Sequence, residues 1–224
     1  MDPFTEEKQT VPSEETQADA AEKDGGTFFG DLMDLAEAGM LTGFVFILIF
    51  IFLLRRVTVD GGSMNPTLLD HDQIMILTPV YEPKNGQIVV IDDQESGLFA
   101  DEAQQEVMKT PGAGMVLVKR LIAKAGQEID IDFETGDVKV DGTLLQEPYI
   151  AEPTRRDEFA FQYPVTIPEG YVFVMGDNRM NSMDSRSPNV ALIPEEEILG
   201  TALFRYDRDG VNREKWTDRF DFLF

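Results

Sequence analysis

The chain has 224 residues, 42% of them hydrophobic, and a formal net charge of -23 at pH 7. This length leaves room for one substantial domain beside a tail and a membrane segment. The charge disfavours nucleic acid as an electrostatic partner. The sequence has no cysteine, which excludes disulfides and thiol catalysis, and its single histidine, His71, excludes a multi-histidine metal site.

The N-terminal part of the sequence predicts a tail followed by a membrane anchor. Residues 1–27 are acidic and contain few large apolar side chains, so we predict a disordered tail. Residues 28–37 are apolar enough for a short interfacial helix. The uncharged run at 38–54 would be roughly 25 Å long as a helix, at the short end of the range that spans a bilayer. We therefore predict an interfacial segment and a transmembrane anchor over residues 28–56.

Two other interpretations of the apolar run are a buried core helix and a cleaved export signal. A surface helix of a soluble domain has a polar side, but residues 44–54 are apolar on every face. An export signal carries positive charge before its apolar run and small residues after it. Here Arg55 and Arg56 follow the run, and the next three residues are Val-Thr-Val. These features favour an uncleaved anchor.

From Val57 onward, short apolar runs alternate with turn signals, which is typical of strands. We predict a mainly β domain over residues 57–224, built from coiled antiparallel sheets or barrel-like. Helical patterns occur only near 98–109 and 194–199. The predicted strands cover residues 73–77, 87–91, 115–122, 128–131, 138–140 and 171–175.

A first candidate for chemistry is Ser63, which follows Gly61 and Gly62 and precedes Pro66. Glycines allow close backbone approach to a ligand, but a Gly-Gly-Ser sequence alone is more often only a turn. A serine hydroxyl also needs a base to become a good nucleophile. His71 lies between two aspartates in a polar turn, so we predict a solvated loop residue there rather than the base.

Lys119 is a second candidate, because it stands inside the apolar run 115–122. Strand alternation would place it on one face with Leu117 and Leu121. A lysine in such surroundings loses its charge more easily and can act as a base. The alternative is a solvent-facing charge that protects an edge strand from aggregation, and the local pattern leaves both open.

A third candidate segment, residues 175–186, is mostly polar and directly follows an apolar strand. It is either a solvated loop or a functional one. Asp and Arg at two-residue spacing can form an ion pair that fixes a loop, and Ser182 could orient a lysine amine.

Together these segments resemble the type I signal peptidases, membrane-anchored Ser-Lys proteases that remove signal peptides from exported preproteins. The matching sequences are Ser-Met-Asn-Pro-Thr at 63–67, Lys-Arg-Leu-Ile at 119–122, and Gly-Asp-Asn-Arg at 176–179 with the polar residues that follow it. The resemblance runs from the anchor to about Arg205. Each fragment is weak evidence alone, but all three in this order after an anchor are specific.

The resemblance implies a role for each matching residue. Ser63 would be the nucleophile and Lys119 the general base, with the Ser182 hydroxyl hydrogen-bonded to the lysine amine. Asp184 and Arg186 would form a structural ion pair beneath the site. The shallow apolar pockets for small side chains before the cleavage point would be shaped by Val59, Met64 and Val118.

The resemblance further implies a serine endopeptidase that works through an acyl-enzyme, with no cofactor and no metal. Its partners would be preprotein signal peptides and membrane lipid, with no nucleic acid. It would lie in the bacterial cell membrane as a single-pass protein with its catalytic domain extracytoplasmic. Against that orientation, Lys8 and Lys23 are the only bases before the anchor, so Arg55 and Arg56 weakly favour a cytoplasmic domain.

The sequence departs from the family pattern at several loops. Gly61 stands where some members have a serine whose hydroxyl completes the oxyanion hole, so the Ser63 backbone N–H would need another donor. Gly86-Gln87 and Gly126-Gln127 replace the usual Gly-Asp pairs. The sequence Ser-Pro-Asn at 187–189 replaces an aromatic residue and glycine, and the acidic insertion at 92–105 has no assigned counterpart.

Three rival functions are weighed against this one. A self-cleaving regulator of the SOS-repressor type shares the dyad, but would need a DNA-binding half and a soluble start. A membrane-tethered β domain that only binds would carry the same residues without activity. A metal hydrolase lacks ligands in this sequence.

Overall fold

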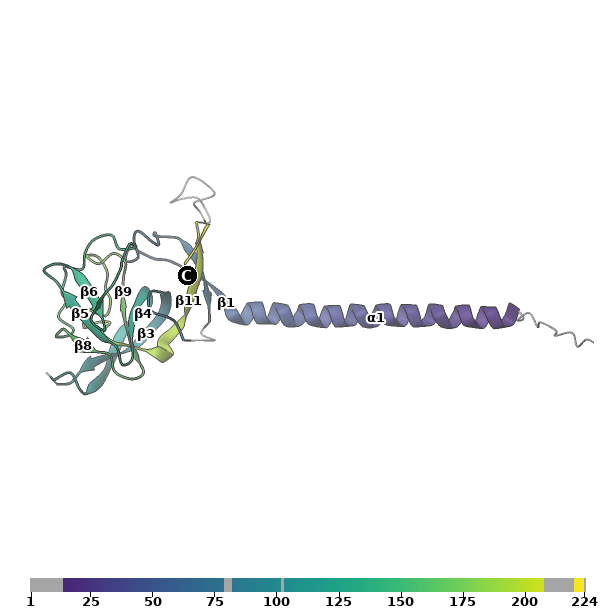
Figure 1. Ribbon diagram of the computed structural model, residues 1–224, viewed down its shortest axis with the longest axis horizontal. Coiled ribbons are helices and arrows are strands. Elements are labelled where there is room, and N and C mark those ends of the chain that lie inside the picture. The colour runs from purple at the N-terminus through teal and green to yellow at the C-terminus, as the bar shows by residue number, and fades with distance from the viewer. Residues whose placement is uncertain (1–13, 79–81, 102, 208–219, 224) are drawn as a thin grey trace, which may run out of the picture. The chain divides into compact units, whose positions relative to one another are not determined.

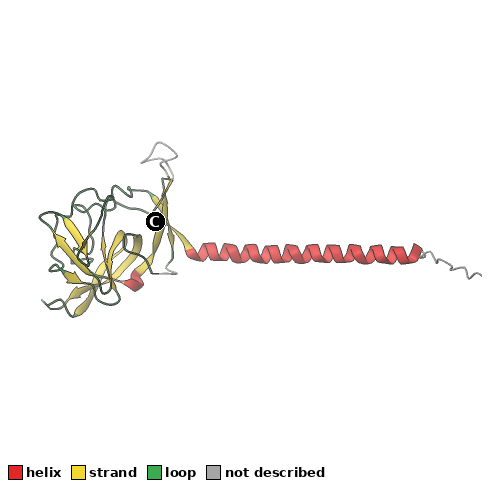
Figure 2. Cartoon of the chain, in the orientation of Figure 1, coloured by secondary structure: helices red, strands yellow, loops and turns green. Residues whose placement is uncertain are grey.

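The computed structural model describes residues 14–78, 82–101, 103–207 and 220–223 (Figure 1). The chain forms two compact units, Met1–Ile51 and Phe52–Phe224. The described part of the first is helical, and in the second nearly all regular secondary structure is strand, joined by long loops (Figure 2). The prediction of a mainly β protein with one N-terminal apolar helix is therefore confirmed.

Helix α1 runs from Glu14 to Leu53. Its sequence has no proline and many good helix formers, so one continuous helix is favoured. The helical backbone extends into the range predicted to be a disordered tail, and residues 1–13 of that range lie outside the described residues. Within α1, Phe28–Leu53 is long and apolar enough to cross a membrane, with a mean hydropathy of 2.3. Only the length and composition of the helix support such a span.

The β unit contains two antiparallel sheets. In the larger sheet the strand order is β1-β2-β11-β3-β4-β9-β10, with β12 added beside β11, and in the smaller it is β7-β6-β5-β8. The larger sheet comprises β1 (Leu54–Thr58), β2 (Gln73–Leu77), β3 (Ile88–Phe99), β4 (Val107–Lys124), β9 (Tyr171–Met175), β10 (Ile193–Pro194), β11 (Ile198–Tyr206) and β12 (Phe220–Phe222). The smaller comprises β5 (Glu128–Asp132), β6 (Asp137–Val140), β7 (Thr143–Leu144) and β8 (Val165–Thr166).

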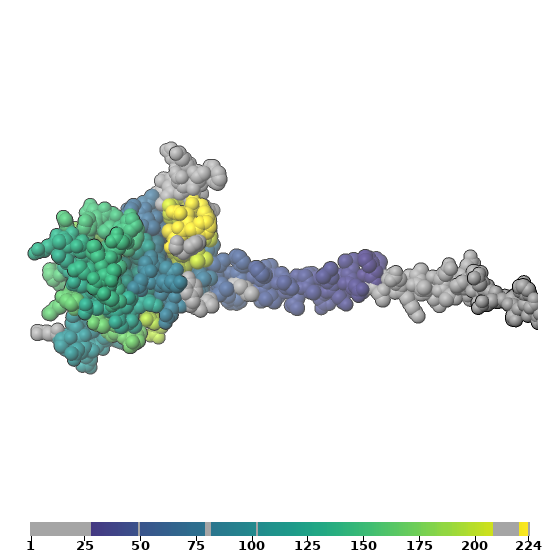
Figure 3. Space-filling view, in the orientation of Figure 1, coloured from purple at the N-terminus to yellow at the C-terminus, as the bar shows by residue number. Residues whose placement is uncertain are grey.

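The strand order mixes early and late parts of the chain. Strand β11 pairs with both β2 and β3, so the C-terminal part closes the sheet between two N-terminal strands. The space-filling view shows early, middle and late residues side by side on one face of the β unit (Figure 3). The pairing fixes the two ends of the loop that follows β1, because the strands on either side of it, β1 and β2, pair with each other and β2 also pairs with β11.

The apolar residues of the strands form three buried clusters. One fills the space between the two sheets and includes Ile129, Val138 and Phe173. The second includes Val89, Leu121 and Val174, and lies along the centre of the larger sheet. The third packs beneath the loop after β1 and contains Val59, Met64, Leu68, Ile74, Ile76, Ile88, Val90 and Ala202. Burial of this apolar surface is the main favourable contribution to folding.

The helical pattern predicted near residues 98–109 is wrong. This segment is the far end of a long hairpin, in which Leu98 pairs with Met108 and Phe99 with Val107. The Phe99 ring also contacts Phe161 edge to face, with centroids 5.8 Å apart. These non-local contacts override the local pattern, as is common for β sequences. The acidic insertion at 92–105 belongs to the same hairpin. The second predicted helix is a single 3-10 turn, Glu195–Glu197, before β11.

Candidate active site

Ser63 lies in the loop that follows β1, and the third motif holds that loop in place. The backbone N–H of Asn178 donates to the Ser63 carbonyl at 3.0 Å, and Asn178 Nδ2 donates to the Gly62 carbonyl at 3.0 Å. The Thr67 hydroxyl donates to the Asp177 carboxylate at 2.5 Å. Three hydrogen bonds thus join segments separated by more than 100 residues, which fixes the position of the serine.

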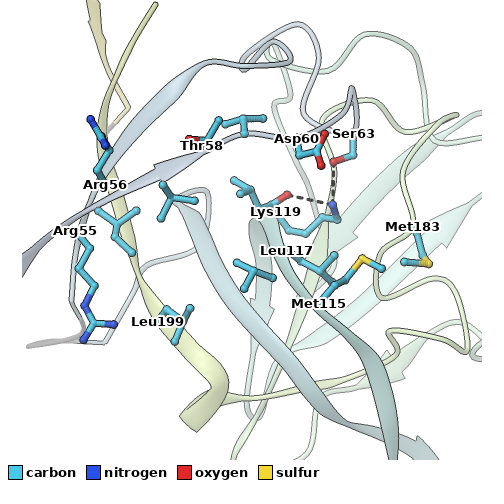
Figure 4. Close-up of a pocket in the computed structure, with 15 residues that line it drawn as sticks. Arg55, Arg56, Thr58, Asp60, Ser63, Met115, Leu117, Lys119, Met183 and Leu199 are labelled. Atoms are coloured by element: carbon cyan, nitrogen blue, oxygen red, sulfur yellow. Dashed lines mark hydrogen bonds between the residues drawn. The ribbon is translucent and has the colours of Figure 1, made fainter. Parts of the chain in front are cut away.

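Lys119 lies on β4 and points at this serine. Its Nζ is 2.9 Å from Ser63 Oγ and donates to the Val118 carbonyl at 3.1 Å (Figure 4). The Lys119 residue is only 3% exposed. A charge that guards an edge strand faces solvent, so the burial argues against that alternative for Lys119.

Burial lowers the pKa of the Lys119 amine below its usual value of 10.5. The carboxylates of Asp184, Asp177 and Asp93 act in the opposite direction, but burial is the larger effect. An ammonium group in apolar surroundings loses hydration that the neutral amine needs much less. Burial therefore shifts this amine toward the uncharged form that a base requires.

Asp184 and Arg186 form a buried, two-pronged ion pair. Arg186 Nε and Nη2 each donate to a different oxygen of Asp184 at 2.8 Å, and both side chains are fully buried. Asp184 also accepts the Gly176 N–H at 2.9 Å. Burial raises the pKa of the Asp184 carboxyl, but Arg186 and these hydrogen bonds outweigh it and leave that pKa below its usual range. The pair anchors the loop on which the third motif lies.

Two further ion pairs were not predicted from the sequence. Arg120 donates twice to Asp177, at 2.8 and 2.6 Å, and its guanidinium stacks 3.8 Å from the centre of the Tyr149 ring. Arg179 donates to both oxygens of Glu147, at 2.6 and 3.1 Å. Asp177 and Arg179 therefore do not pair with each other. Local spacing gave no signal, because the true partners lie 57 and 32 positions away.

Gly176 is required where the serine loop meets β9. A Cβ at this position would lie 2.5 Å from the Ser63 carbonyl oxygen and would also overlap the Ser182 hydroxyl. Real Cβ atoms do not approach backbone oxygens so closely. The absent side chain thus allows the first and third motifs to touch.

Ser182 is buried, but its predicted hydrogen bond to the lysine amine is not formed. Within the described residues its Oγ has no hydrogen-bond partner. The hydroxyl lies against Gly176, while the amine is engaged by Ser63 and by the Val118 carbonyl. The expected role of Ser182 toward Lys119 is therefore corrected, since the lysine strand supplies its own acceptor.

A cleft of about 790 Å³ opens beside the Ser63–Lys119 pair. Val59 and Val118 line it, as the resemblance implies, together with Leu117. Met64 does not line it, because its side chain is fully buried in the core cluster beneath the serine loop. Figure 4 shows Arg55 and Arg56 at one end of the cleft, with the serine and lysine toward the other.

Two strand edges are open at the cleft. Among the described strands, β1 pairs with β2 alone, and β4 pairs with β9 from Arg120 onward, so residues 115–119 have one edge that no described strand covers. Free backbone groups at such edges can bind an extended peptide. Within the described residues the Ser63 N–H donates to no acceptor, whereas the Gly61 N–H donates to Asp70 at 2.8 Å. The Ser63 N–H is thus free to meet a ligand.

His71 lies away from this chemistry, as predicted. Its side chain is 70% exposed and lies 3.3 Å from the carboxylate of its neighbour Asp70. Among the described residues, no group of three or more acidic or histidine side chains could hold a metal ion. The arrangement is one in which serine and lysine alone could transfer an acyl group.

The model of the family described as "Signal peptidase, peptidase S26" matches residues 32–207 of the chain. The chain belongs to this family. Signal peptidase I T of Bacillus subtilis (strain 168) is 32% identical over 213 residues, which cover 90% of this chain and 94% of the relative. Signal peptidase I of Bacillus licheniformis is 32% identical over 182 residues, or 77% of this chain and 87% of the relative.

A crystal structure of a signal peptidase I from Enterococcus faecalis V583 is also similar, at 22% identity and a TM-score of 0.40, over 55% of this chain and 97% of that one. Membership of the signal peptidase family makes the chain a peptidase, and all three motifs lie within the matched residues. The interpretations as a DNA-binding regulator or as a binding domain without activity are therefore less favoured than catalysis.

The Arg120–Asp177 ion pair generates a prediction about stability. Changing Asp177→Asn leaves a buried guanidinium without its counter-charge, which costs about 3–5 kcal/mol in comparable cases. We expect the free energy of unfolding in urea to fall by that amount. The matched control is Lys109→Gln, which removes an exposed ion pair with Glu95 and should lower the free energy of unfolding far less. Equal losses in the two variants would contradict the importance of the buried pair.

Proposed function

We propose that this signal peptidase cleaves signal peptides from exported preproteins by acyl transfer to Ser63, with Lys119 as the general base. The observation that carries the proposal is the 2.9 Å contact between the serine hydroxyl and a buried amine of lowered pKa. A serine and a base within hydrogen-bond distance are the signature of an activated nucleophile.

The first half-reaction follows from this contact. The neutral Lys119 amine takes the proton of the Ser63 hydroxyl while the oxygen attacks the scissile carbonyl carbon. The negative charge that forms on the carbonyl oxygen meets the free Ser63 N–H, which acts as a donor of the oxyanion hole. When the peptide C–N bond breaks, the Lys119 ammonium returns the proton to the leaving amine. The mature protein departs, and the signal peptide stays esterified to Ser63.

The second half-reaction releases the signal peptide. Water gives a proton to the Lys119 amine and attacks the ester carbonyl, and the proton then passes to the departing Ser63 oxygen. The same two side chains therefore serve both halves. Asp184 and Arg186 act at a distance, because they hold the third motif against the serine loop. This chemistry is complete with the residues named and calls for no metal or cofactor.

The cleft supports a peptide substrate with small side chains before the cut. An extended chain could add to the free edges of β1 and β4. Hydrogen bonds to its backbone would then hold it, whatever the identity of most of its side chains. Its side chains would then alternate toward and away from the walls made by Val59 and Val118. Shallow walls of this kind would admit alanine-like residues at the first and third positions before the cut.

The apolar helix supports membrane attachment. The side chains described for Phe28–Leu53 are not buried in the protein, so their apolar surface is left for lipid to cover. We propose that this helix spans the bacterial cell membrane once, with the catalytic domain on the extracytoplasmic side. Ser63 follows the end of the helix closely in sequence, which would raise its effective concentration near membrane-bound signal peptides.

The dyad predicts the outcome of two substitutions. Ser63→Ala removes the nucleophile, and Lys119→Met removes the base while keeping an apolar side chain of similar length. We expect each to lower kcat for preprotein cleavage by about 100- to 10,000-fold, while the circular dichroism spectrum stays that of the wild type. Lys124→Met, further along the same strand, is the control and should retain activity. An active Lys119→Met enzyme would refute the proposed base.

An acylating inhibitor distinguishes catalysis from simple binding. A penem should add its mass to the wild-type protein at Ser63, as measured by intact-protein mass spectrometry. The Ser63→Ala variant should remain unmodified. Absence of modification in a folded wild-type protein would favour a binding role.

The lowered pKa of Lys119 predicts a pH dependence. Because the base must be neutral, kcat/KM should rise with pH and level off above the pKa of this amine, which lies below 10.5. In the window between that pKa and the usual value, the unfolded chain binds more protons than the folded one, so stability also rises with pH. The Lys119→Met variant should lack this rise in the free energy of unfolding. A kinetic limb at the usual lysine pKa would contradict the buried amine.

The proposed topology has a direct test. Protease added outside spheroplasts should degrade the β unit, because the domain is then extracytoplasmic. A cytoplasmic control protein should survive in the same sample. Protection of the β unit until the membrane is broken would instead support the orientation that Arg55 and Arg56 favour.

A further inference from the structure

We propose that a second cavity, adjoining the dyad cleft, binds the first residues of the mature protein and favours polar side chains there. This inference rests on the proposed function. The cavity has a volume of about 340 Å³, and its lining includes Arg156, Glu158, Asn181, Ser182, Met183 and Asn189.

The position of the cavity relates it to the reaction. Met183 lines both this cavity and the dyad cleft. In Figure 4 Met183 lies on the other side of the Ser63–Lys119 pair from Arg55 and Arg56. An extended peptide that enters along the cleft and passes the dyad would therefore leave it at Met183, which is where the second cavity begins.

The chemistry of the two walls decides which part of the substrate each would bind. Near the dyad the cleft presents Val59, Leu117 and Val118, which suit the small apolar residues before the cut. The second cavity presents an ion pair and amide and hydroxyl groups. Residues after the cut belong to the mature protein and will face water once it is released, so polar side chains suit them. The second cavity is thus matched to the mature side.

Two polar groups in the wall lack hydrogen-bond partners. Ser182 Oγ and Glu158 Oε1 are buried, and neither has a hydrogen-bond partner within the described residues. The nearest cation to Glu158 Oε1 is Arg156 Nε, at 3.4 Å. Buried polar groups are normally satisfied, so each exception calls for an explanation. Both atoms are buried, so backbone N–H or polar side-chain groups of a bound peptide would complete them once the Ser182 or Glu158 side chain turns toward the cavity.

The wall is held in place by the same ion pair that supports the active site. The Arg156 carbonyl accepts a hydrogen bond from Arg186 Nη1 at 3.1 Å, and Arg156 Nη1 donates to the Met180 carbonyl at 3.1 Å. The cavity is therefore preorganised relative to the dyad, as a specificity subsite must be. An apolar side chain placed there would leave these polar groups without water and without partners.

The experiment compares pairs of substrate peptides that are identical up to the cut and carry either Gln or Leu as the second mature residue. We expect wild-type kcat/KM to favour Gln by about 10-fold, in line with the effect of one unpaired polar group. Asn189→Leu replaces an exposed polar residue of the rim and should reduce that ratio to about two or less. Gln146→Leu, an exposed position outside the cavity, is the control and should keep the ratio near 10.

A second variant keeps the test decisive if Asn189→Leu does not fold. Asn189→Asp adds a negative charge on a side chain of nearly the same size. Repulsion of an acidic substrate residue should then raise the Gln-to-Glu ratio of kcat/KM at the second mature position about 10-fold above the wild-type ratio. The selectivity for Ala over Val at the last residue before the cut should stay unchanged in both Asn189 variants, because that residue lies in the dyad cleft.

A wild-type ratio near one, or a ratio that both Asn189 variants leave unchanged, would overturn the inference. Cleavage that persists in Ser63→Ala would instead overturn the proposed function. The two failures are thus separable, because the first is a ratio between substrates and the second is a loss of dependence on one hydroxyl.

Discussion

The proposed chemistry depends on the burial of one amine. Lys119 reaches Ser63 from inside a strand whose neighbours exclude water, and the same exclusion lowers the pKa of the amine. A charged lysine would be poorly solvated there, so the folded protein favours the neutral form at some loss of stability. Such a loss is typical of a functional site, where a reactive group lowers the stability of the folded protein.

The loops around this amine are held by buried ion pairs in addition to the apolar packing beneath the serine loop. Asp177 joins the serine loop to Arg120. Asp184 joins Gly176, at the start of the third motif, to Arg186 at its end. Buried pairs of this kind add little net stability compared with apolar residues, but losing one partner is expensive. Their geometry is directional, which suits a site in which two atoms must stay within hydrogen-bond distance. The same network extends through Arg186 to the wall of the second cavity.

The two units divide the tasks of the protein. The apolar helix has the length and composition to cross a membrane, and the β unit carries the serine and lysine that we propose cleave the peptide. Free strand edges and a shallow apolar wall favour recognition of backbone and small side chains rather than of a long sequence. In the proposed function, attachment to the membrane where signal peptides arise would add selectivity that such a site does not supply.

By itself the sequence determined the elements with a strong local signal: the apolar helix, most strands, and three motifs whose order matches one peptidase family. It did not determine which charges pair, since the partners of Asp177 and Arg179 are distant and no local rule relates them. It also misled at residues 98–109, where cross-strand pairing overrides the helical pattern. Only the tertiary structure showed the Ser182 hydroxyl unpartnered and Lys119 in contact with Ser63. Periodicity is set by neighbours along the chain, whereas burial and ion pairing are set by whichever segments the sheets bring together.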